Sequence, residues 1–329
     1  MQIGVLGTAA IARNHVIPAV QKTDHTVRAV ASRDADRAST FADALDIARA
    51  YGSYETLVAD DELDAVYIPL PNSLHEEWAI RSAEAGHHVL CEKPLATDVD
   101  GARRIRDACE SAGVVLMEGY MHRYHPRTKR ALAVAEKFDE IREFAGVFQA
   151  PRSGEADDLV SLTPECAGGS LMHLGCYPIT VARWMMGQPD RATGTAFDTR
   201  DCGVDTGFSG VLGYDDGGTA TLTCGFDTDR FLHRYRIEAT NGWLEAERAF
   251  NPRDDEAETV LEYALDGRKC VERFDPFDHY RLEIEHFADC IENGREPLTG
   301  ATNGIQTLAV IDALFESEAS GNTVSIASE

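Results

Sequence analysis

The chain has 329 residues, of which 43% are hydrophobic, and it carries a formal net charge of −25 at pH 7. This length exceeds one typical domain of roughly 100–200 residues, so two domains are expected, and no apolar run approaches the roughly 18 residues of a membrane span. Such a negative charge argues against nucleic acid as a partner, because binding phosphates requires a basic face.

The chain contains only five lysines, so 26 of its 31 basic residues are arginines. An acidic, lysine-poor surface is typical of adaptation to high salt, where screening weakens the repulsion between carboxylates; an ordinary acidic protein is the alternative. Eight scattered cysteines without a Cys-x-x-Cys pair indicate free thiols. The first residues form no secretory signal, so we expect a cytoplasmic protein without a membrane partner.

The first 120 residues alternate short apolar strands with helical patterns. We expect strands at 3–6, 27–31, 65–68, 88–91 and 114–117 and helices at 9–20, 34–45 and 101–112, with Asp34 capping the second helix and the capping box Ser73-x-x-Glu76 opening another. This alternation predicts right-handed βαβ units and a parallel sheet of the Rossmann type. Residues 1–120 are therefore expected to form a dinucleotide-binding domain.

The pattern changes after residue 120. Helices are expected at 126–137, 171–186, 280–293 and 302–317, and strands at 143–148, 192–197, 208–214, 219–226, 234–239 and 243–247, with a hairpin turn at Asp216-Gly217-Gly218. Consecutive strands joined by short turns form antiparallel sheets, so residues 121–329 predict an α+β domain with a mainly antiparallel, open-faced sheet. An uncovered sheet face favours a homo-oligomer, a dimer or a tetramer.

A degenerate glycine motif lies between the first strand and the first helix. It consists of Gly7, Thr8, Ala9, Ala10, Ile11 and Ala12. Gly7 serves the tight turn, Ala9 is small enough for a pyrophosphate to approach the backbone, and Ala12 permits close packing of the helix. The free N–H groups of the helix start suit the phosphates of a dinucleotide.

The end of the second strand indicates which nucleotide binds. An NAD site places Asp or Glu there, whereas this strand is followed by Ser32 and Arg33, with Arg37 one turn later. A hydroxyl and guanidinium groups suit a 2′-phosphate, so we expect NADP. The alternative is NAD, with Asp34 as the ribose ligand and Arg33 as a surface residue.

Glu92-Lys93-Pro94 directly follows the strand at 88–91. The tripeptide therefore places an amine at the carboxyl end of a parallel strand, where open α/β sheets bind ligands. In a lysine-poor chain this position favours a functional lysine over a solvated surface charge.

Together with Leu70-Pro71-Asn72, His75, the segment 119–126, Gly168-Gly169-Ser170 and Gly175-Cys176-Tyr177-Pro178, these motifs resemble the Gfo/Idh/MocA oxidoreductases along essentially the whole chain. The closest resemblance is to the branch with glucose–fructose oxidoreductase, D-xylose dehydrogenase and dimeric dihydrodiol dehydrogenase. It implies NAD(P)-dependent oxidation or reduction at a sugar or cyclic diol carbon.

The resemblance also implies roles for individual residues. Lys93 is similar to the family's active-site lysine, and Tyr177 stands where this branch has its catalytic tyrosine. Leu70, Asn72, His75, Glu92 and Pro94 match residues at the cofactor cleft, and Arg123 lies in the segment that borders the substrate pocket. A cation beside Tyr177 favours the phenolate, so Lys93 and Tyr177 are expected to form the acid–base pair.

One position departs from the family. The residue four positions before Tyr177 is usually Asp, and here it is His173. Residues i and i+4 share a helix face, so His173 and Tyr177 are expected to point into one substrate pocket, where an imidazole relays a proton or binds a sugar hydroxyl. The loop around 151–166 is expected to add further pocket residues.

The histidine pairs His122-x-x-His125 and His87-His88 lack carboxylate or cysteine partners at ligand spacing, so no metal site is expected.

From the cofactor motifs and the family resemblance, we expect an NADP-dependent aldose dehydrogenase acting on a xylose-like sugar. The alternatives are a dihydrodiol dehydrogenase or anhydro-sugar reductase and, from a different class, a catalytically silent NADP-binding sensor.

Overall fold

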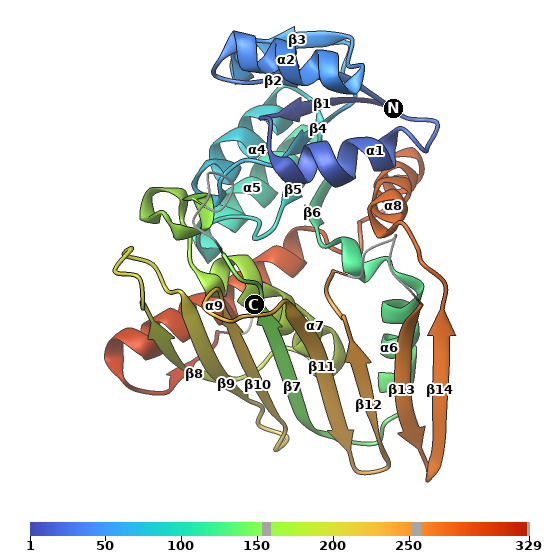
Figure 1. The fold of residues 1–329 in the computed structure, drawn as a ribbon, viewed down its shortest axis with the longest axis vertical. Helices are drawn as coiled ribbons and strands as arrows, with labels where there is room; N and C mark the ends of the chain where they lie inside the picture. The colour runs from blue at the N-terminus through green and yellow to red at the C-terminus, as the bar shows by residue number, and fades with distance from the viewer. Residues whose placement is uncertain (153–158, 252–257, 328–329) are drawn as a thin grey trace. The chain divides into compact units, whose positions relative to one another are not determined.

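A computed structural model describes residues 1–152, 159–251 and 258–327. The chain forms two compact units, of which the first combines Met1–Met121 with Asp278–Ile305 and the second combines His122–Phe277 with Gln306–Glu329 (Figure 1). The chain therefore first passes from one unit to the other after Met121, next to the domain boundary expected at residue 120. Residues 278–305, which the sequence analysis assigned to the second domain, group with the first unit.

The first unit is built on a parallel sheet with the strand order β3-β2-β1-β4-β5-β6. The strands are β1 (Gln2–Leu6), β2 (Thr26–Ala31), β3 (Arg49–Tyr51), β4 (Ala65–Ile68), β5 (His88–Glu92) and β6 (Leu116–Gly119). The order reverses between β1 and β4, and ligands bind at such a switch point, outside the carboxyl ends of the strands. This confirms the Rossmann-type sheet predicted from the alternating pattern.

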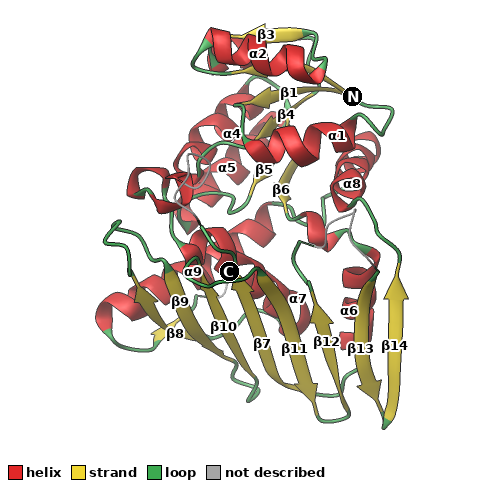
Figure 2. Ribbon diagram, in the orientation of Figure 1, coloured by secondary structure: helices red, strands yellow, loops and turns green. Residues whose placement is uncertain are grey.

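Helical segments connect these strands (Figure 2). They are η1 (Ala12–Val16), α1 (Ile17–Val20), α2 (Ala35–Leu45), α3 (Tyr54–Val58), η2 (Asn72–Leu74), α4 (His75–Glu84) and α5 (Val99–Ala112). The 3-10 turn η3 (Met121–Arg123) follows β6, and α8 (His279–Asn293), from later in the chain, also belongs to the first unit. The Asp34 side chain caps α2, as expected, by accepting from the Arg37 N–H at 3.0 Å. The capping box at Ser73 and Glu76 was wrong, because the 3-10 turn η2 leads directly into α4 and Leu74 takes the N-cap position.

The second unit contains a nine-stranded sheet with the order β14-β13-β12-β11-β7-β10-β9-β8-β15. The strands are β7 (Ile141–Gln149), β8 (Arg191–Phe197), β9 (Gly207–Gly213), β10 (Thr219–Gly225), β11 (Leu232–Ala239), β12 (Gly242–Glu247), β13 (Thr259–Leu265), β14 (Arg268–Phe274) and β15 (Val324–Ser325). Only β7 and β10 pair in parallel among the described strands, so the sheet is mixed and mainly antiparallel, as expected.

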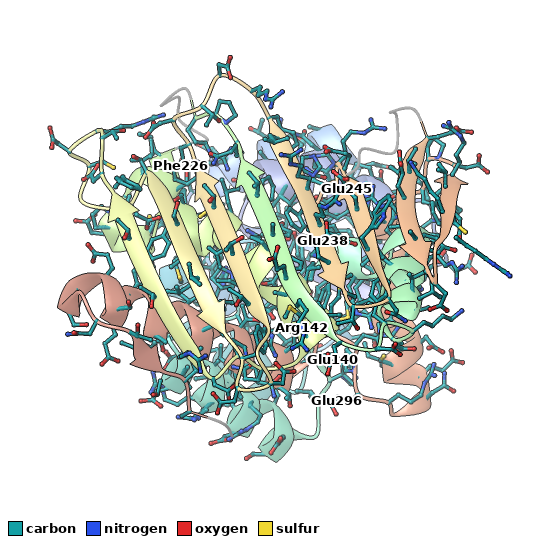
Figure 3. All side chains as sticks on the ribbon, turned by 90° about the horizontal axis from the view of Figure 1, so that it is seen from below. Glu140, Arg142, Phe226, Glu238, Glu245 and Glu296 are labelled. Atoms are coloured by element: carbon teal, nitrogen blue, oxygen red, sulfur yellow. The ribbon has the colours of Figure 1, made fainter. Side chains whose placement is uncertain are left out.

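Helices pack on one face of this sheet. The helical segments of the second unit are α6 (Pro126–Ala135), η4 (Leu159–Leu162), η5 (Pro164–Cys166), η6 (Leu171–Gly175), α7 (Cys176–Met186) and most of α9 (Ala301–Ser320). Along β7, β10 and β11 buried residues alternate with more exposed ones, because successive side chains point to opposite faces. Figure 3 views the opposite face, where the strands lie in front of the helices and the labelled Glu238 and Glu245 belong to β11 and β12.

No helix among the described ranges is long and apolar enough to cross a membrane.

Candidate active site

The turn between β1 and η1 has a backbone that favours glycine. Gly7 has a φ of +96°, and its N–H donates to the Ala31 carbonyl at 2.8 Å. A Cβ at this position would lie 2.9 Å from Cδ2 of Leu70, which would have to shift, so the positive φ and this contact both favour glycine. The expected residues Thr8, Ala9, Ala10 and Ile11 follow with exposed or half-buried side chains, and Ala12 is fully buried.

The residues expected to hold a 2′-phosphate lie directly after β2. Ser32 is buried, and its Oγ accepts from the Asp34 N–H at 3.2 Å, whereas Arg33 and Arg37 are exposed. Asp34 caps α2 with its carboxylate, so this group stabilises the helix start that presents the two arginines.

Tyr54, at the start of α3, is a site residue that the sequence analysis missed. Burial raises the pKa of Tyr54, while the charge of Arg33, a hydrogen bond with its guanidinium and the charge of Arg37 act in the opposite direction. The Tyr54 hydroxyl also lies 3.9 Å from where a Cβ of Gly7 would be. The phenol therefore stands between the glycine turn and the arginines. The Ser53 cap at the start of α3 was the available signal, since it marks the helix that presents Tyr54.

His75 connects the two segments expected at the cofactor cleft. Its Nδ1 lies 2.8 Å from the Pro94 carbonyl oxygen and its Nε2 lies 2.9 Å from the Leu70 carbonyl oxygen. Burial lowers the pKa of His75 to about 4, so the ring is neutral at physiological pH. His75 has no exposed surface, so the structure places it behind the cleft residues Leu70 and Pro94, where the single N–H of its neutral ring donates to one of the two carbonyls. Asn72, also expected at the cleft, is buried in η2.

Glu92 and Lys93 end β5 at the carboxyl edge of the sheet, and both are half-buried. The Tyr67 hydroxyl donates to Glu92 Oε1 at 2.7 Å. Burial raises the pKa of Glu92, and the Lys93 charge, the Tyr67 hydrogen bond and a backbone hydrogen bond act against this rise. The Lys93 ammonium therefore lies beside a carboxylate that a buried phenol holds in place.

In the second unit, Tyr177 lies within an aromatic cluster near the start of α7. Its ring centroid is 5.2 Å from those of His122 and Phe148 and 5.8 Å from that of Phe250. These contacts orient the phenol through packing, and Tyr177 keeps 6% of its surface exposed.

Arg123 and His173 belong to the same unit. The Arg123 guanidinium lies over the Trp184 ring at 5.2 Å, and burial lowers its pKa. His173 is half-buried and lies in η6, a π turn that leads into α7 and changes the angular offset between His173 and Tyr177 from that of a regular helix. Residues 153–158 of the loop expected to complete the pocket lie outside the described residues.

A buried carboxylate holds the start of the helix that carries Tyr177. Asp205 Oδ2 accepts from the Ser170 hydroxyl at 2.6 Å and from the Leu171 N–H at 2.8 Å. Burial raises the pKa of Asp205 to about 6, against the effect of these hydrogen bonds. No local pattern marked Asp205, because its partners lie about 35 residues earlier in the chain.

The histidines considered as metal ligands have other contacts. His87 bonds to the carbonyls of Leu63 and Val58, and His88 Nδ1 accepts from the Val115 N–H. His122 packs in the Tyr177 cluster, while His125 Nδ1 caps α6. Within the described residues, no group of three or more His, Cys, Asp or Glu side chains could hold a metal ion.

Comparison with known proteins places this geometry in a family. Residues 1–120 match the model of an oxidoreductase family with an NAD-binding Rossmann fold, and residues 127–245 match the GFO/IDH/MocA C-terminal domain. D-xylose 1-dehydrogenase (NADP(+)) 2 of Haloferax volcanii is 48% identical over 99% of this chain and 100% of its own length. The chain belongs to the Gfo/Idh/MocA family.

Solved structures of Gfo/Idh/MocA relatives agree with the fold. A 3-ketoreductase from Actinomadura kijaniata in complex with NADP and TDP-benzene is 30% identical, with a TM-score of 0.88 over 96% of this chain and 97% of that one. The aldose–aldose oxidoreductase from Caulobacter crescentus, complexed with glycerol, is 26% identical, with a TM-score of 0.89 over 99% of both chains. The chain is thus a Gfo/Idh/MocA oxidoreductase along its whole length.

Proposed function

We propose that this protein is an NADP-dependent oxidoreductase that transfers a hydride between nicotinamide and a sugar carbon, as an aldose 1-dehydrogenase acting on a xylose-like sugar. The observation that carries the proposal is the 48% identity, over 99% of the chain, to an NADP-dependent D-xylose 1-dehydrogenase. Ser32, Arg33 and Arg37 follow β2 and form a group that we call the arginine corner. This group supports NADP over NAD as the cofactor.

The residues of the first unit fit this cofactor. The bare backbone at Gly7, where a Cβ would meet Leu70, suits a pyrophosphate, and Ser32, Arg33 and Arg37 offer a hydroxyl and two guanidiniums to a 2′-phosphate. Asp34, the ribose ligand of the NAD alternative, caps α2 with its carboxylate. When bound, NADP⁺ supplies the hydride acceptor.

The chain's own residues then handle the proton and the substrate. Oxidation of a carbinol carbon requires removal of its hydroxyl proton, and we assign this step to the Tyr177 hydroxyl oxygen. Lys93 is assigned to stabilise the developing oxyanion with its ammonium. His173 and Arg123 are assigned to the sugar hydroxyls, the first as a proton relay. Lys93 belongs to the first unit and Tyr177 to the second, so their convergence on one substrate stays a prediction.

Two alternatives stay open. The reverse chemistry of an anhydro-sugar reductase is supported by a 28% identical 1,5-anhydro-D-fructose reductase of Ensifer adhaerens, with 98% of both chains covered. A dihydrodiol dehydrogenase, which oxidises a diol, belongs to the same enzyme alternative. A silent NADP-binding sensor is favoured only by His173 in place of the usual Asp.

Absorbance of NADPH or NADH tests the proposal, followed in molar KCl with NADP⁺ or NAD⁺ and a panel of aldoses, diols and anhydro-sugars, and in the reverse direction with NADPH and the corresponding carbonyl compounds. We expect turnover of D-xylose-like aldoses with NADP⁺ and loss of activity of about 10²-fold or more in Lys93→Ala and Tyr177→Phe, since acid–base groups contribute on this order. Tight NADPH binding without turnover of any substrate would favour the sensor. Turnover only in the reductive direction would favour the reductase.

We also propose that the chain forms homo-oligomers through the open face of its second sheet (Figure 3). On this face Arg236 pairs with Glu238 and Glu245 and lies over the Trp243 ring, so the surface combines charge pairs with apolar area. All eight cysteines are free thiols, which supports a reducing compartment such as the cytoplasm. The excess of carboxylates supports work at high salt.

A further inference from the structure

A glutamate that the proposed chemistry does not use is buried in β6, the strand that pairs with β5. All four residues of β6 are buried, and Glu118 has an exposed fraction of 0%. Strands that are covered on both faces of a parallel sheet are normally apolar, and a glutamate is almost never fully buried unless its carboxyl group is paired. The burial of Glu118 therefore depends on polar partners.

Both carboxylate oxygens of Glu118 accept hydrogen bonds. Oε1 accepts from the Leu95 N–H at 2.9 Å, and Oε2 accepts from the Asn303 side-chain amide at 2.8 Å. The backbone of Glu118 is held as well, because its N–H donates to the Thr299 carbonyl at 2.7 Å and its carbonyl accepts from the Thr299 hydroxyl at 2.8 Å. The carboxylate thus links the start of α9 to the segment that follows Lys93, and all of these residues belong to the first unit.

The Leu95 N–H belongs to the peptide group that joins Pro94 to Leu95. The carbonyl oxygen of the same group lies 2.8 Å from His75 Nδ1, so both polar ends of this peptide group contact a buried side chain. The Leu95 side chain is buried too, and a Cβ on Gly304 would lie 2.7 Å from its Cδ2. Because a peptide group is planar and proline fixes its own φ, a fixed orientation of this group restricts the backbone of Lys93.

We propose that Glu118 is a positioning residue for Lys93. Its carboxylate holds the peptide group that follows Pro94, and this backbone contact fixes where the Lys93 side chain leaves the carboxyl edge of the sheet. Without this acceptor the Leu95 N–H would be buried and unsatisfied, and the segment would move to satisfy it. The ammonium would then no longer lie where it stabilises the oxyanion. This inference rests on the role of Lys93 in the proposed function.

Two single variants break the contact from opposite sides. Glu118→Met keeps a long side chain but removes both acceptors, whereas Asn303→Asp sets a second carboxylate against the first. We expect each to lower kcat about tenfold or more, measured well below its Tm, since a small displacement of a catalytic group is costly.

The double variant Glu118→Gln/Asn303→Asp exchanges donor and acceptor. The introduced amide accepts from the Leu95 N–H with its oxygen and donates to the introduced carboxylate with its nitrogen. We expect this variant to keep kcat within about threefold of the wild type, because no buried group is left unpaired. Wild-type kcat in both single variants would overturn the proposal, and so would a double variant as slow as Glu118→Met.

Thr299→Val is the matched control. It removes the hydroxyl that donates to the Glu118 carbonyl at 2.8 Å, keeps the shape of the side chain and leaves the carboxylate in place. We expect it to lower Tm, because a buried hydrogen bond is lost, while kcat stays near the wild-type value. A decrease in kcat as large as that in Glu118→Met would mean that any weakening of the contact between β6 and the segment before α9 slows the enzyme. That result would overturn a specific role of the carboxylate.

A second readout does not depend on activity. The chain contains only five lysines, so ¹³C labelling of lysine gives five ε-methylene signals in NMR spectra, and Lys93→Arg assigns the signal of Lys93. We expect this signal to shift in Glu118→Met and to return in the double variant, while the other four signals stay in place. An unmoved Lys93 signal in Glu118→Met would overturn the inference. If no substrate turns over, the proposed function fails, and these spectra still decide whether Glu118 positions Lys93.

Discussion

Among single residues, Tyr54 connects the two halves of the proposed cofactor site. Its hydroxyl lies beside the Gly7 turn, and Arg33 acts on its pKa through charge and hydrogen bonding, so we infer that the phenol interacts with this guanidinium. Its ring packs edge-on against Trp78 at 5.1 Å, which keeps the phenol in place without the hydroxyl. The hydroxyl can therefore be removed while the packing is kept.

We predict that Tyr54→Phe raises KM for NADP⁺ about tenfold and leaves KM for NAD⁺ nearly unchanged. A hydrogen bond to a charged group contributes about 1.5–3 kcal/mol, and a loss near the lower end corresponds to this change. The measurement is steady-state kinetics with both cofactors. Arg33→Ala should reduce the preference for NADP⁺ over NAD⁺ further. In the double variant the two losses of preference should not add, because Tyr54 acts through Arg33.

Tyr51→Phe provides the control, since the Tyr51 hydroxyl donates to Asp60 at 2.9 Å and has no part in the arginine corner. It should leave both KM values unchanged. Equal effects of Tyr54→Phe on the KM values of the two cofactors would contradict a role of Tyr54 at the 2′-phosphate. An unchanged preference for NADP⁺ over NAD⁺ in Arg33→Ala would show that Arg33 does not bind the 2′-phosphate.

Residue contacts of this kind could be predicted only in part from the sequence. Ser32, Arg33 and Arg37 could be proposed because they follow one strand within six residues, a local pattern, and their role at a 2′-phosphate stays a prediction. Tyr54 and Asp205 were not singled out because the partners of each lie tens of residues away in the chain, and nothing in the spacing marks such a pair. His75 could be proposed from its motif, but its burial behind Leu70 and Pro94 depends on the packing of three separate segments.

Among the elements, α7 is placed by close approach to the central strand β7. A Cβ on Gly146 would lie 2.5 Å from Cβ of Pro178, the residue next to Tyr177, and 2.8 Å from a ring carbon of Phe144. The glycine therefore lets the helix lie against the sheet, and it sets the depth at which Tyr177 is held.

We predict that Gly146→Ala lowers the free energy of unfolding by about 1–3 kcal/mol, the usual cost of overpacking, and lowers kcat while leaving the Kd for NADPH unchanged. Denaturant unfolding, kinetics and NADPH fluorescence titration measure the three quantities. Gly207→Ala is the matched control in β9, since its Cβ would meet nothing closer than 3.8 Å. It should be neutral or stabilise by up to about 1 kcal/mol. Weaker NADPH binding in Gly146→Ala would show that the strain is not confined to the second unit.

Element prediction succeeded where a pattern was long or strongly apolar. β4 lies at the residues expected, and the helices around 34–45 and 280–293 agree within a residue. β3 and α3 were missed because three and five residues are too few to establish a period. β14 (Arg268–Phe274) was missed because it alternates charged and half-buried residues at the sheet edge, where neither face is strongly hydrophobic. β13 was missed although it buries Leu261 and Tyr263 on one face.

For the whole molecule, charge is the dominant property. With 56 acidic and 31 basic residues, 25 carboxylates lack a cation even if every Lys and Arg forms a pair. Exposed ion pairs such as Arg104–Glu76 and Arg191–Asp215 contribute little individually, about 0–1 kcal/mol each. The repulsion among the unpaired carboxylates is therefore the larger electrostatic effect on the folded state. Salt weakens both this repulsion and the attraction within the exposed ion pairs.

We predict that Tm rises steeply between about 0.1 and 1 M KCl and then levels off, because the Debye length falls from about 10 Å to about 3 Å over this range. Calorimetry across a KCl series measures this, and a sucrose series is the control. Sucrose is excluded from the protein surface and so stabilises compact states, but it does not screen charge. At low KCl it should therefore restore only part of the decrease in Tm. A Tm that stays constant or falls with KCl would mean that the ion pairs outweigh the carboxylate repulsion, and adaptation to high salt would then have no support from stability.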